Sequence, residues 1–251
     1  MKGHRKMKET KMEREDLLAA YEDLRVADVR DGMDTLGMHF IGSMSPEIRP
    51  LWRTRAWGIA RTCRYVPYQG TIPTMTPEEY WKWVGWYYSN VCTYPWMDDI
   101  RPGDFCVIDA SGVDVGLMGS NNAMGGFLKG ARAYVASSGV RDTDELILQK
   151  VPFWTAFVSQ PMVQGRLAYD SKDIPVAVGG VLVNPGDVIA ADGDGVIVVP
   201  RKMAFDVARW AREEHQRDKV GRRTLYKALG MRLDETVMDK RPAKRRRSPR
   251  T

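Results

Sequence analysis

The stretch PVAVGGVLVNPGDVIAADGDGVIVVP, residues 175–200, indicates the fold class most directly, because it alternates short apolar runs with turn residues. Valine-rich runs bounded by Gly, Pro, Asn and Asp are typical of strands. Asp192, Asp194 and Gly195 alternate as in a calcium-binding loop, but an apolar run stands where the closing Glu of such a loop belongs. The segment therefore predicts strands joined by a hairpin turn.

The same pattern extends toward the N-terminus. Pro102-Gly103-Asp104 precedes the run FCVIDA as Pro185-Gly186-Asp187 precedes VIAAD, and each triplet combines a fixed proline φ with a glycine that tolerates positive φ. Other β-like runs are WGIARTCRYV, ARAYVAS and FWTAFV. Apolar residues at helical spacing occur in residues 13–24, 26–37 and 203–220. We predict an α/β fold with a strand-rich centre and helices toward both ends.

The positive charge of the chain lies in its two ends. Of the formal net charge of +6, residues 240–251 contribute +7 and residues 1–14 contribute +4, so residues 15–239 carry −5. We predict a basic disordered arm (1–14), one domain (15–226) and a C-terminal extension with a basic tail (227–251). The ends are interpreted as solvated tails, and nucleic-acid binding is expected only through them.

Residue spacing argues against several kinds of site. The longest apolar runs are far below the roughly 20 residues of a membrane-spanning helix, and no apolar segment follows the basic N-terminus as in a secretory signal. We expect a cytoplasmic protein with no membrane partner. Cys63, Cys92 and Cys106 form no CxxC pair and are interpreted as packing residues, the three histidines lack zinc spacing, and no GxGxxG motif occurs. A bound metal should therefore have oxygen ligands.

The segment PEEYWKWVGWYYSNVCTYP, residues 77–95, holds three of the eight tryptophans and four tyrosines. Such a concentration of aromatic side chains is found in a core, in an oligomer interface or in the wall of a large pocket. The sequence favours core or interface but leaves all three alternatives open.

Two segments could carry chemistry. Gly116–Asn122 leads into a helical stretch for which Ser120 or Asn121 is the predicted N-cap, and free N–H groups at a helix start bind carboxylate or phosphate. About twenty residues later, Arg141 and Asp142 follow a predicted strand. Arg presents a planar fork for a carboxylate or an enolate, and Asp is a hard oxygen ligand for a divalent cation.

Four blocks, taken in order, resemble the RraA-like family, which includes the regulator of ribonuclease E activity A and the class II hydroxymethyl-oxoglutarate aldolases. The blocks are VRDGMDTLG (29–37), WGIARTC (57–63), PGDFCVIDASG (102–112) with GSNN and SSGVRDTDEL downstream, and residues 175–200. The resemblance covers roughly residues 20–220. It implies a compact β/β/α swivelling (phosphohistidine-domain-like) fold in residues 15–226. It also implies a homo-oligomer, a trimer or a dimer of trimers, with sites at subunit boundaries.

The resemblance also implies roles for individual residues. The family's aldolases have an acid, twenty intervening residues and then an Arg-Asp pair, which falls on Arg141 and Asp142 here. Asp142 would hold Mg²⁺ or Mn²⁺ with Glu145 as a supporting acid, and Arg141 would stabilise a pyruvate enolate. Gly119, Ser120, Asn121 and Asn122 would bind the carboxylate of a 2-oxo acid, and Glu213 of a neighbouring subunit would position the catalytic water.

This sequence departs from the aldolase pattern at Ser120, which stands where the aldolases have the acid. Supporting ligands of this kind are typically worth about 10 to 100-fold in metal affinity or activity. We predict a divalent-metal-dependent lyase that cleaves or decarboxylates a 2-oxo acid to a pyruvate-type product. The alternatives are a non-catalytic RraA-like regulator or binding protein, and a diverged enzyme with different substrate chemistry.

Overall fold

A nine-stranded mixed sheet forms the centre of the computed structural model, which describes residues 10–238. Its main path runs β1-β6-β5-β3-β2-β10-β11, with β4 paired to β5 and β7 paired to β2, and β8 and β9 form a separate hairpin. The strands are β1 (Arg49–Pro50), β2 (Ala56–Pro67), β3 (Asp104–Asp109), β4 (Gly116–Met118), β5 (Ala133–Val140), β6 (Phe153–Val158), β7 (Leu167–Lys172), β8 (Val176–Val178), β9 (Val181–Val183), β10 (Val188–Asp192) and β11 (Gly195–Val199).

The strand β2 connects two parts of the sheet. Its first half pairs antiparallel with β10, and its second half pairs antiparallel with β7. It also runs parallel to β3, which pairs parallel with β5. Because β4 and β6 are parallel to β5 as well, the carboxyl ends of these strands meet at one edge of the sheet. Ligand sites of open α/β sheets lie at such an edge.

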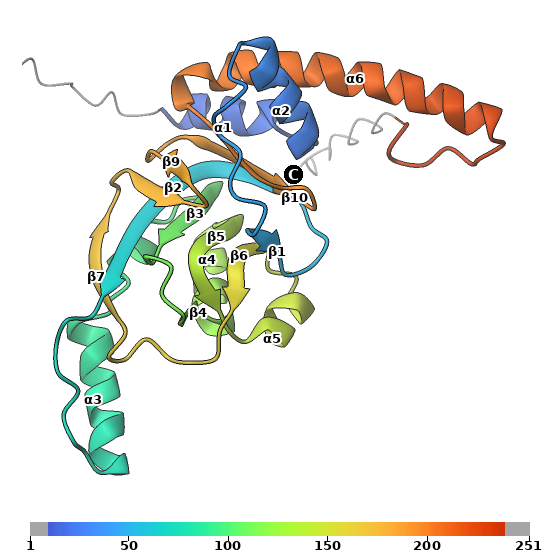
Figure 1. The fold of residues 1–251 in the computed structure, drawn as a ribbon. Coiled ribbons are helices and arrows are strands. Elements are labelled where there is room, and N and C mark those ends of the chain that lie inside the picture. Colours follow the sequence, from blue (N-terminus) through green and yellow to red (C-terminus); the bar gives the residue numbers. More distant parts are fainter. Residues whose placement is uncertain (1–9, 239–251) are drawn as a thin grey trace, which may run out of the picture.

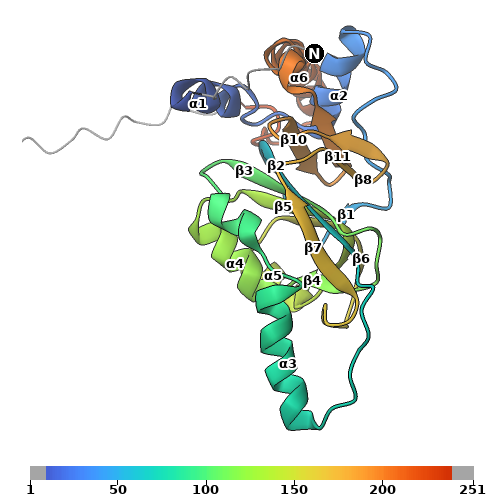
Figure 2. The same cartoon turned by 90° about the vertical axis from the view of Figure 1, so that its left-hand side faces the viewer.

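Helices lie on both sides of the sheet, as the two views in Figures 1 and 2 show. Helices α1, α2 and α6 lie across one side, α4 and α5 lie on the other, and α3 projects from the body near the end of β2. The helices are α1 (Lys11–Ala20), α2 (Val26–Thr35), α3 (Pro77–Asn90), α4 (Ser120–Leu128), α5 (Thr143–Leu148) and α6 (Ala204–Ala228), with 3-10 turns η1 (Pro95–Asp99) and η2 (Arg201–Met203). The predicted mixed α/β architecture is confirmed.

The predicted strand runs all form strands, and both PGD triplets are turns, with φ of 91° at Gly103 and 93° at Gly186. The predicted hairpin joins β10 to β11. Asp192 pairs there with Gly195, whose φ is 138°. The three cysteines are free and buried, as expected of packing residues. Among residues 10–238, no helix has the length and apolar character needed to cross a membrane.

The helix boundaries differ from the prediction at both ends of the chain. Helix α1 begins at Lys11, inside the predicted arm, because the Thr10 hydroxyl caps the N–H of Glu13. Arg14 is buried and donates to Asp104 at 2.5 Å, so this turn is part of the body. Helix α6 continues past the predicted residue 220 to Ala228. Residues 1–9 and 239–251, including the predicted basic tail, lie outside the described residues.

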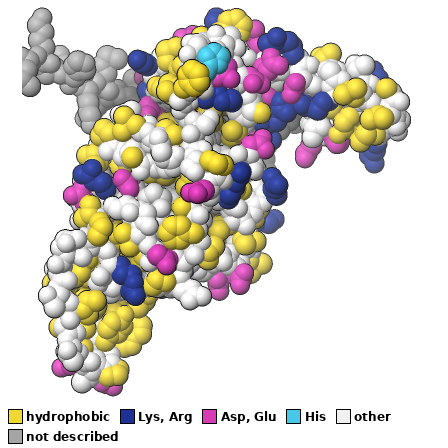
Figure 3. Space-filling model, viewed as in Figure 1, with side chains coloured by type: hydrophobic (Ala, Val, Ile, Leu, Met, Phe, Trp, Pro, Cys, Tyr) yellow, Lys and Arg dark blue, Asp and Glu magenta, His cyan; other side chains and the backbone are white. Residues whose placement is uncertain are grey.

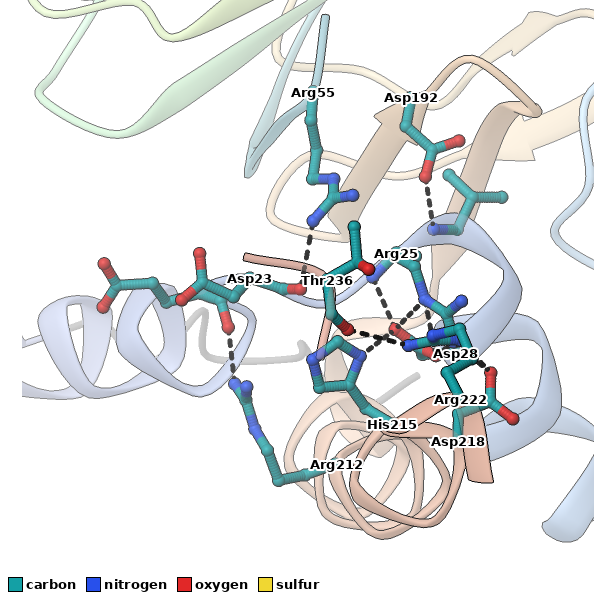
Figure 4. A network of polar contacts seen from close by, with 12 residues as sticks. Asp23, Arg25, Asp28, Arg55, Asp192, Arg212, His215, Asp218, Arg222 and Thr236 are labelled. Atoms are coloured by element: carbon teal, nitrogen blue, oxygen red, sulfur yellow. Dashed lines mark hydrogen bonds and ion pairs between the residues drawn. The ribbon is translucent and has the colours of Figure 1, made fainter. Parts of the chain in front are cut away.

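A network of ionic side chains joins α2 to α6 (Figure 4). The Asp28 carboxylate is fully buried, accepts from the Arg25 backbone N–H at 2.8 Å and lies 2.8 Å from His215 Nδ1. Arg25 pairs with Asp28 and also with Asp218 at 2.7 Å. The helices approach closely at Gly32, where a Cβ would lie 2.7 Å from the Val207 carbonyl oxygen. Packing and charge pairing therefore fix α6 against α2.

Candidate functional site

The loop between β5 and α5 presents Arg141 and Asp142 at the carboxyl edge of the sheet. Strand β5 ends at Val140, and the Arg141 N–H donates to the Met118 carbonyl oxygen at 3.1 Å, which ties the loop to the end of β4. Asp142 is the N-cap of α5 and has left-handed backbone angles, φ 55° and ψ 41°. Asp tolerates this region better than most side chains do, at a cost of roughly 1 kcal/mol. The turn directs the chain from the strand into α5.

Two glycines of the neighbouring segment make room for these side chains. A Cβ on Gly119 would lie 2.3 Å from Asp142 Oδ2, and a Cβ on Gly116 would lie 2.8 Å from the Cβ of Arg141. Since real Cβ atoms do not approach so closely, any larger residue would displace Arg141 or Asp142. Gly116 and Gly119 are therefore required because Arg141 and Asp142 lie too close to their backbone for a side chain to fit.

The start of α4 corrects one prediction. The N-cap is Gly119, and neither Ser120 nor Asn121 caps the helix. The N–H of Ser120 instead donates to Asp142 Oδ2 at 3.1 Å, so a carboxylate from the next strand-helix connection takes the place of a local cap. A negative charge at this position is favoured by the N–H groups and dipole of the helix. The same bond fixes one oxygen of Asp142.

These segments enclose a cleft of about 380 Å³. Its wall contains seven residues from the two segments predicted to carry chemistry, and two tyrosines from elsewhere. The lining residues are Tyr88, Tyr94, Gly116, Leu117, Gly119, Asn121, Asn122, Arg141 and Asp142. The structure thus brings Gly119, Asn121, Asn122, Arg141 and Asp142 together.

The charged pair in the cleft is loose. Arg141 Nε lies 3.7 Å from Asp142 Oδ1, and the two side chains are 34% and 37% exposed. Pairs of this kind contribute at most about 1 kcal/mol to stability and leave N–H donors and oxygen lone pairs available to a ligand. The Tyr94 hydroxyl donates to the Leu117 carbonyl oxygen at 2.9 Å, and burial raises the pKa of Tyr94, with Arg141 opposing in part. Tyr94 is therefore a neutral donor.

Three predicted residues do not line the cleft. Ser120 reaches the site through its backbone N–H, and Glu145 is exposed on α5. Glu213 is exposed on α6, which both cartoon views place across the sheet from α4 and α5 (Figures 1 and 2). Within one chain Glu213 is remote from Arg141. Its predicted role was that of a residue from a neighbouring subunit, and this stays a prediction.

The donor set limits the kind of metal ion that the cleft suits. Within the described part of the chain, no three His, Cys, Asp or Glu side chains are grouped as metal ligands. Asp142 is the carboxylate of the cleft, and Gly119 keeps its oxygens clear of a neighbouring side chain. Mg²⁺ commonly binds through one or two carboxylates and completes its shell with water and substrate oxygens. The residues fit such an ion and do not fit a closed protein cage.

The aromatic segment 77–95 supplies residues that the sequence did not assign. Tyr87 in this segment and Trp96, the residue that follows it, are fully buried in the core. Tyr88 and Tyr94 line the cleft. Trp81 and Trp86 are exposed along α3, the projection at the lower left of Figure 3. Core and pocket wall are therefore both correct for part of the segment. Tyr88 lies in α3 and Tyr94 lies beyond its end, so no spacing in the sequence marks the two as neighbours at the cleft.

The comparisons with known proteins agree with this architecture. The family model RraA-like, described as Aldolase/RraA, matches residues 26–198. Protein DlpA of Legionella pneumophila is 26% identical over 202 residues, which are 76% of this chain and 29% of that protein. The 4-hydroxy-4-methyl-2-oxoglutarate aldolase of Thermus thermophilus is 33% identical over 106 residues, 41% of this chain and 63% of that protein. The chain thus spans less than two thirds of either relative.

A solved structure has the same fold. It is that of Streptomyces coelicolor RraAS2, described as an unusual member of the RNase ES inhibitor RraA protein family. The TM-score is 0.66 at 25% identity, over 82% of this chain and 96% of that one. The fold predicted from the four sequence blocks is therefore confirmed.

Proposed function

The chain belongs to the RraA-like family, and from this premise we propose that it is a divalent-metal-dependent lyase that acts on a 2-oxo acid. Relatives named as aldolases support a carbon–carbon lyase in general terms. The observation that carries the proposal is the cleft in which Arg141 and Asp142 lie beside the glycine-led start of α4. The Arg141 cation and the exposed N–H groups suit the oxygens of a 2-oxo acid, and the Asp142 carboxylate suits the divalent ion of the proposal.

The residues of the chain have separate tasks in this proposal. The N–H groups at the start of α4, around Asn121 and Asn122, receive the substrate carboxylate and orient it. In retro-aldol cleavage the 4-hydroxyl loses its proton, the C3–C4 bond breaks, and its electron pair passes through C3 onto the C2 oxygen. The Arg141 guanidinium donates to that oxygen as it becomes negative. Protonation at C3 then gives pyruvate.

Asp142 would hold Mg²⁺ or Mn²⁺, with Glu145 as a supporting acid, and such an ion supplies Lewis-acid polarisation of the keto oxygen when bound. We propose further that the water that takes up the hydroxyl proton is positioned by Glu213 of a second copy. Glu213 is exposed on α6 and remote from the cleft of its own chain. This part of the proposal therefore requires a homo-oligomer, a trimer or a dimer of trimers.

The test is pyruvate release from oxaloacetate and from branched 4-hydroxy-2-oxo acids, with Mg²⁺ or Mn²⁺ and after chelation. Asp142→Ala should reduce the rate by at least about 100-fold, since it removes the carboxylate of the cleft. Asp144→Ala is the matched control, because Asp144 is exposed on α5 outside the cleft lining. Equal rates for wild type and Asp142→Ala would refute the lyase proposal.

One observation favours a second candidate, a non-catalytic regulator. Ser120 replaces the acid of the aldolase pattern, and a structural relative is described as belonging to an RNase inhibitor family. In that case the chain would bind a ribonuclease and release no pyruvate from any 2-oxo acid. The regulator would be supported if the wild-type chain and its Asp142→Ala variant inhibited a purified RNase E-type enzyme equally.

A further inference from the structure

The cleft has a charged end and an aromatic wall, and from this contrast we propose a substrate class. The geometry points to a 2-oxo acid with one carboxylate and an aromatic or planar apolar substituent at its far end. This inference rests on the proposed lyase function. For retro-aldol cleavage it specifies a 4-aryl-4-hydroxy-2-oxo acid, which yields pyruvate and an aromatic aldehyde.

The aromatic wall consists of Tyr88, near the end of α3, and Tyr94, just before η1. Their ring centroids are 6.4 Å apart at an interplanar angle of 36°, and the Tyr94 ring lies 5.8 Å from that of Tyr65. Tyr65 is itself buried, donates to the Thr93 carbonyl oxygen at 2.8 Å and accepts from Trp96 Nε1 at 2.9 Å. Tyr65 therefore fixes Tyr94 from the core side, and a ligand ring would contact a preformed surface.

The wall presents ring surface more than polar groups. The Tyr94 hydroxyl is committed to the Leu117 carbonyl oxygen at 2.9 Å, which fixes the orientation of its ring. Leu117 is 2% exposed and belongs to the hydrophobic core against which Tyr88 and Tyr94 pack. Aromatic pairs in offset or tilted arrangements add about 0.5 to 1.5 kcal/mol beyond the burial of their area. An aromatic substituent would gain both contributions here.

The charges of the cleft disfavour a dicarboxylate. Arg141 is the one Lys or Arg among the residues that line the cleft in the described chain, and Asp142 is the one acid. Once Arg141 and the helix start serve the 2-oxo acid group, a second carboxylate would lie against tyrosine rings without a cation. Burying an unpaired charge costs several kcal/mol. A neutral substituent avoids this cost.

The size of the cleft agrees with a longer substrate. At about 380 Å³ it lies in the range of roughly 300 to 1,000 Å³ over which pockets enclose ligands larger than a three-carbon acid. The tyrosines belong to α3 and the segment after it, so this wall is separate from the β4-α4 and β5-α5 loops that carry the charged end.

The inference can be tested by calorimetric binding of phenylpyruvate, 2-oxoglutarate and pyruvate to the full chain in the presence of Mg²⁺. Phenylpyruvate should bind about tenfold more tightly than either of the others. Tyr88→Ala should abolish that preference and leave pyruvate affinity within about twofold, whereas Tyr88→Phe should keep it, because the ring remains. Trp81→Ala, which alters an exposed residue of α3 outside the cleft, is the control and should change nothing.

The outcomes separate this inference from the lyase proposal. Preferential binding of phenylpyruvate that depends on Tyr88, with no pyruvate release from oxaloacetate or from any 4-hydroxy-2-oxo acid, would support the substrate class and refute the lyase. Tighter binding of 2-oxoglutarate, an unchanged preference in Tyr88→Ala, or no binding of phenylpyruvate would overturn the inference. Pyruvate release from dicarboxylic substrates alone would also overturn it while leaving the lyase in place.

Discussion

Two clusters of ionic side chains lie on opposite sides of the sheet, and they are held in different ways. Between α2 and α6, the buried Asp28 has contacts with Arg25 and His215, and Arg25 also pairs with Asp218. In the cleft, the guanidinium of Arg141 and the carboxylate of Asp142 are 3.7 Å apart and about one third exposed. Charges that satisfy each other hold helices together. Charges kept apart beside glycines remain available for a ligand.

The largest effect should come from the satisfied cluster. Asp28→Ala should lower the free energy of unfolding by about 3 to 5 kcal/mol, because it leaves Arg25 and His215 without their buried partner. The catalytic rate per folded molecule should stay the same, which denaturation curves and pyruvate release measured together would reveal.

Asp31→Ala is the matched control for that change, because Asp31 is an exposed acid of the same helix. Partial burial, and then repulsion from Glu214 and neighbouring acids, raise the pKa of Asp31. Its loss should change stability by no more than about 0.5 kcal/mol. The comparison between the clusters would break down if Asp28→Ala abolished catalysis without affecting unfolding.

The next effect concerns the space that the cleft keeps around Asp142. Gly119→Ala should reduce pyruvate release by about 100-fold, because its Cβ would displace a carboxylate that lies 2.3 Å away. Gly125→Ala, on the same helix, adds a Cβ that would lie 3.7 Å from Met97 Cε, an ordinary contact, and should leave the rate intact. If both variants kept full activity, the position of Asp142 would not matter to the reaction.

A smaller effect is expected from restoring the acid of the aldolase pattern. Ser120→Asp should strengthen Mg²⁺ binding about tenfold, since it adds a carboxylate beside Asp142. Ser120→Asn has a similar shape without the charge and serves as the control. Calorimetric titration with Mg²⁺ measures both, and an unchanged affinity in Ser120→Asp would contradict the placement of the missing acid at this position.

The smallest effect should be on stability as a function of pH. Burial lowers the pKa of His215, outweighing Asp28, which raises it. The unfolded chain then binds more protons than the folded one as the pH falls through about 6.5, so the free energy of unfolding should decrease there. Asp28 does not titrate in this window, because hydrogen bonds from Arg25 keep the pKa of its carboxyl lowered in spite of burial.

His215→Gln should remove this pH dependence, and urea denaturation on either side of pH 6.5 measures it. The cleft contains no histidine among its lining residues in the described chain, so it should not contribute. A pH dependence that persists in His215→Gln would assign the effect to another group.

The strands could be predicted from the sequence, since apolar runs between turn residues determine them locally. The N-cap of α4 could not, because the carboxylate that serves it comes from Asp142, 22 residues away. Helix α3 has a signal in the local sequence. Thr76 and Glu79 form a capping box around Pro77, whose fixed φ suits a first helical turn.

The site could be predicted in part, because one part of it is encoded by residues that are neighbours in the sequence. Arg141 and Asp142 stand next to each other in the sequence, and their place after a strand puts them at the carboxyl edge of the sheet. Tyr88 and Tyr94 reach the cleft only because α3 packs beside it, which depends on tertiary contacts that no local pattern encodes. The functional roles of all these residues stay predictions.

The pairing of α2 with α6 has a consequence for how the protein forms during synthesis. Asp28 and His215 are 187 residues apart in sequence, so this helix layer cannot assemble until nearly the whole domain has left the ribosome. Closing so long a loop costs on the order of 5 kcal/mol of chain entropy before any contact compensates. The sheet strands that α2 and α6 cover remain open to solvent until then, and exposed apolar strands of this kind are prone to aggregation.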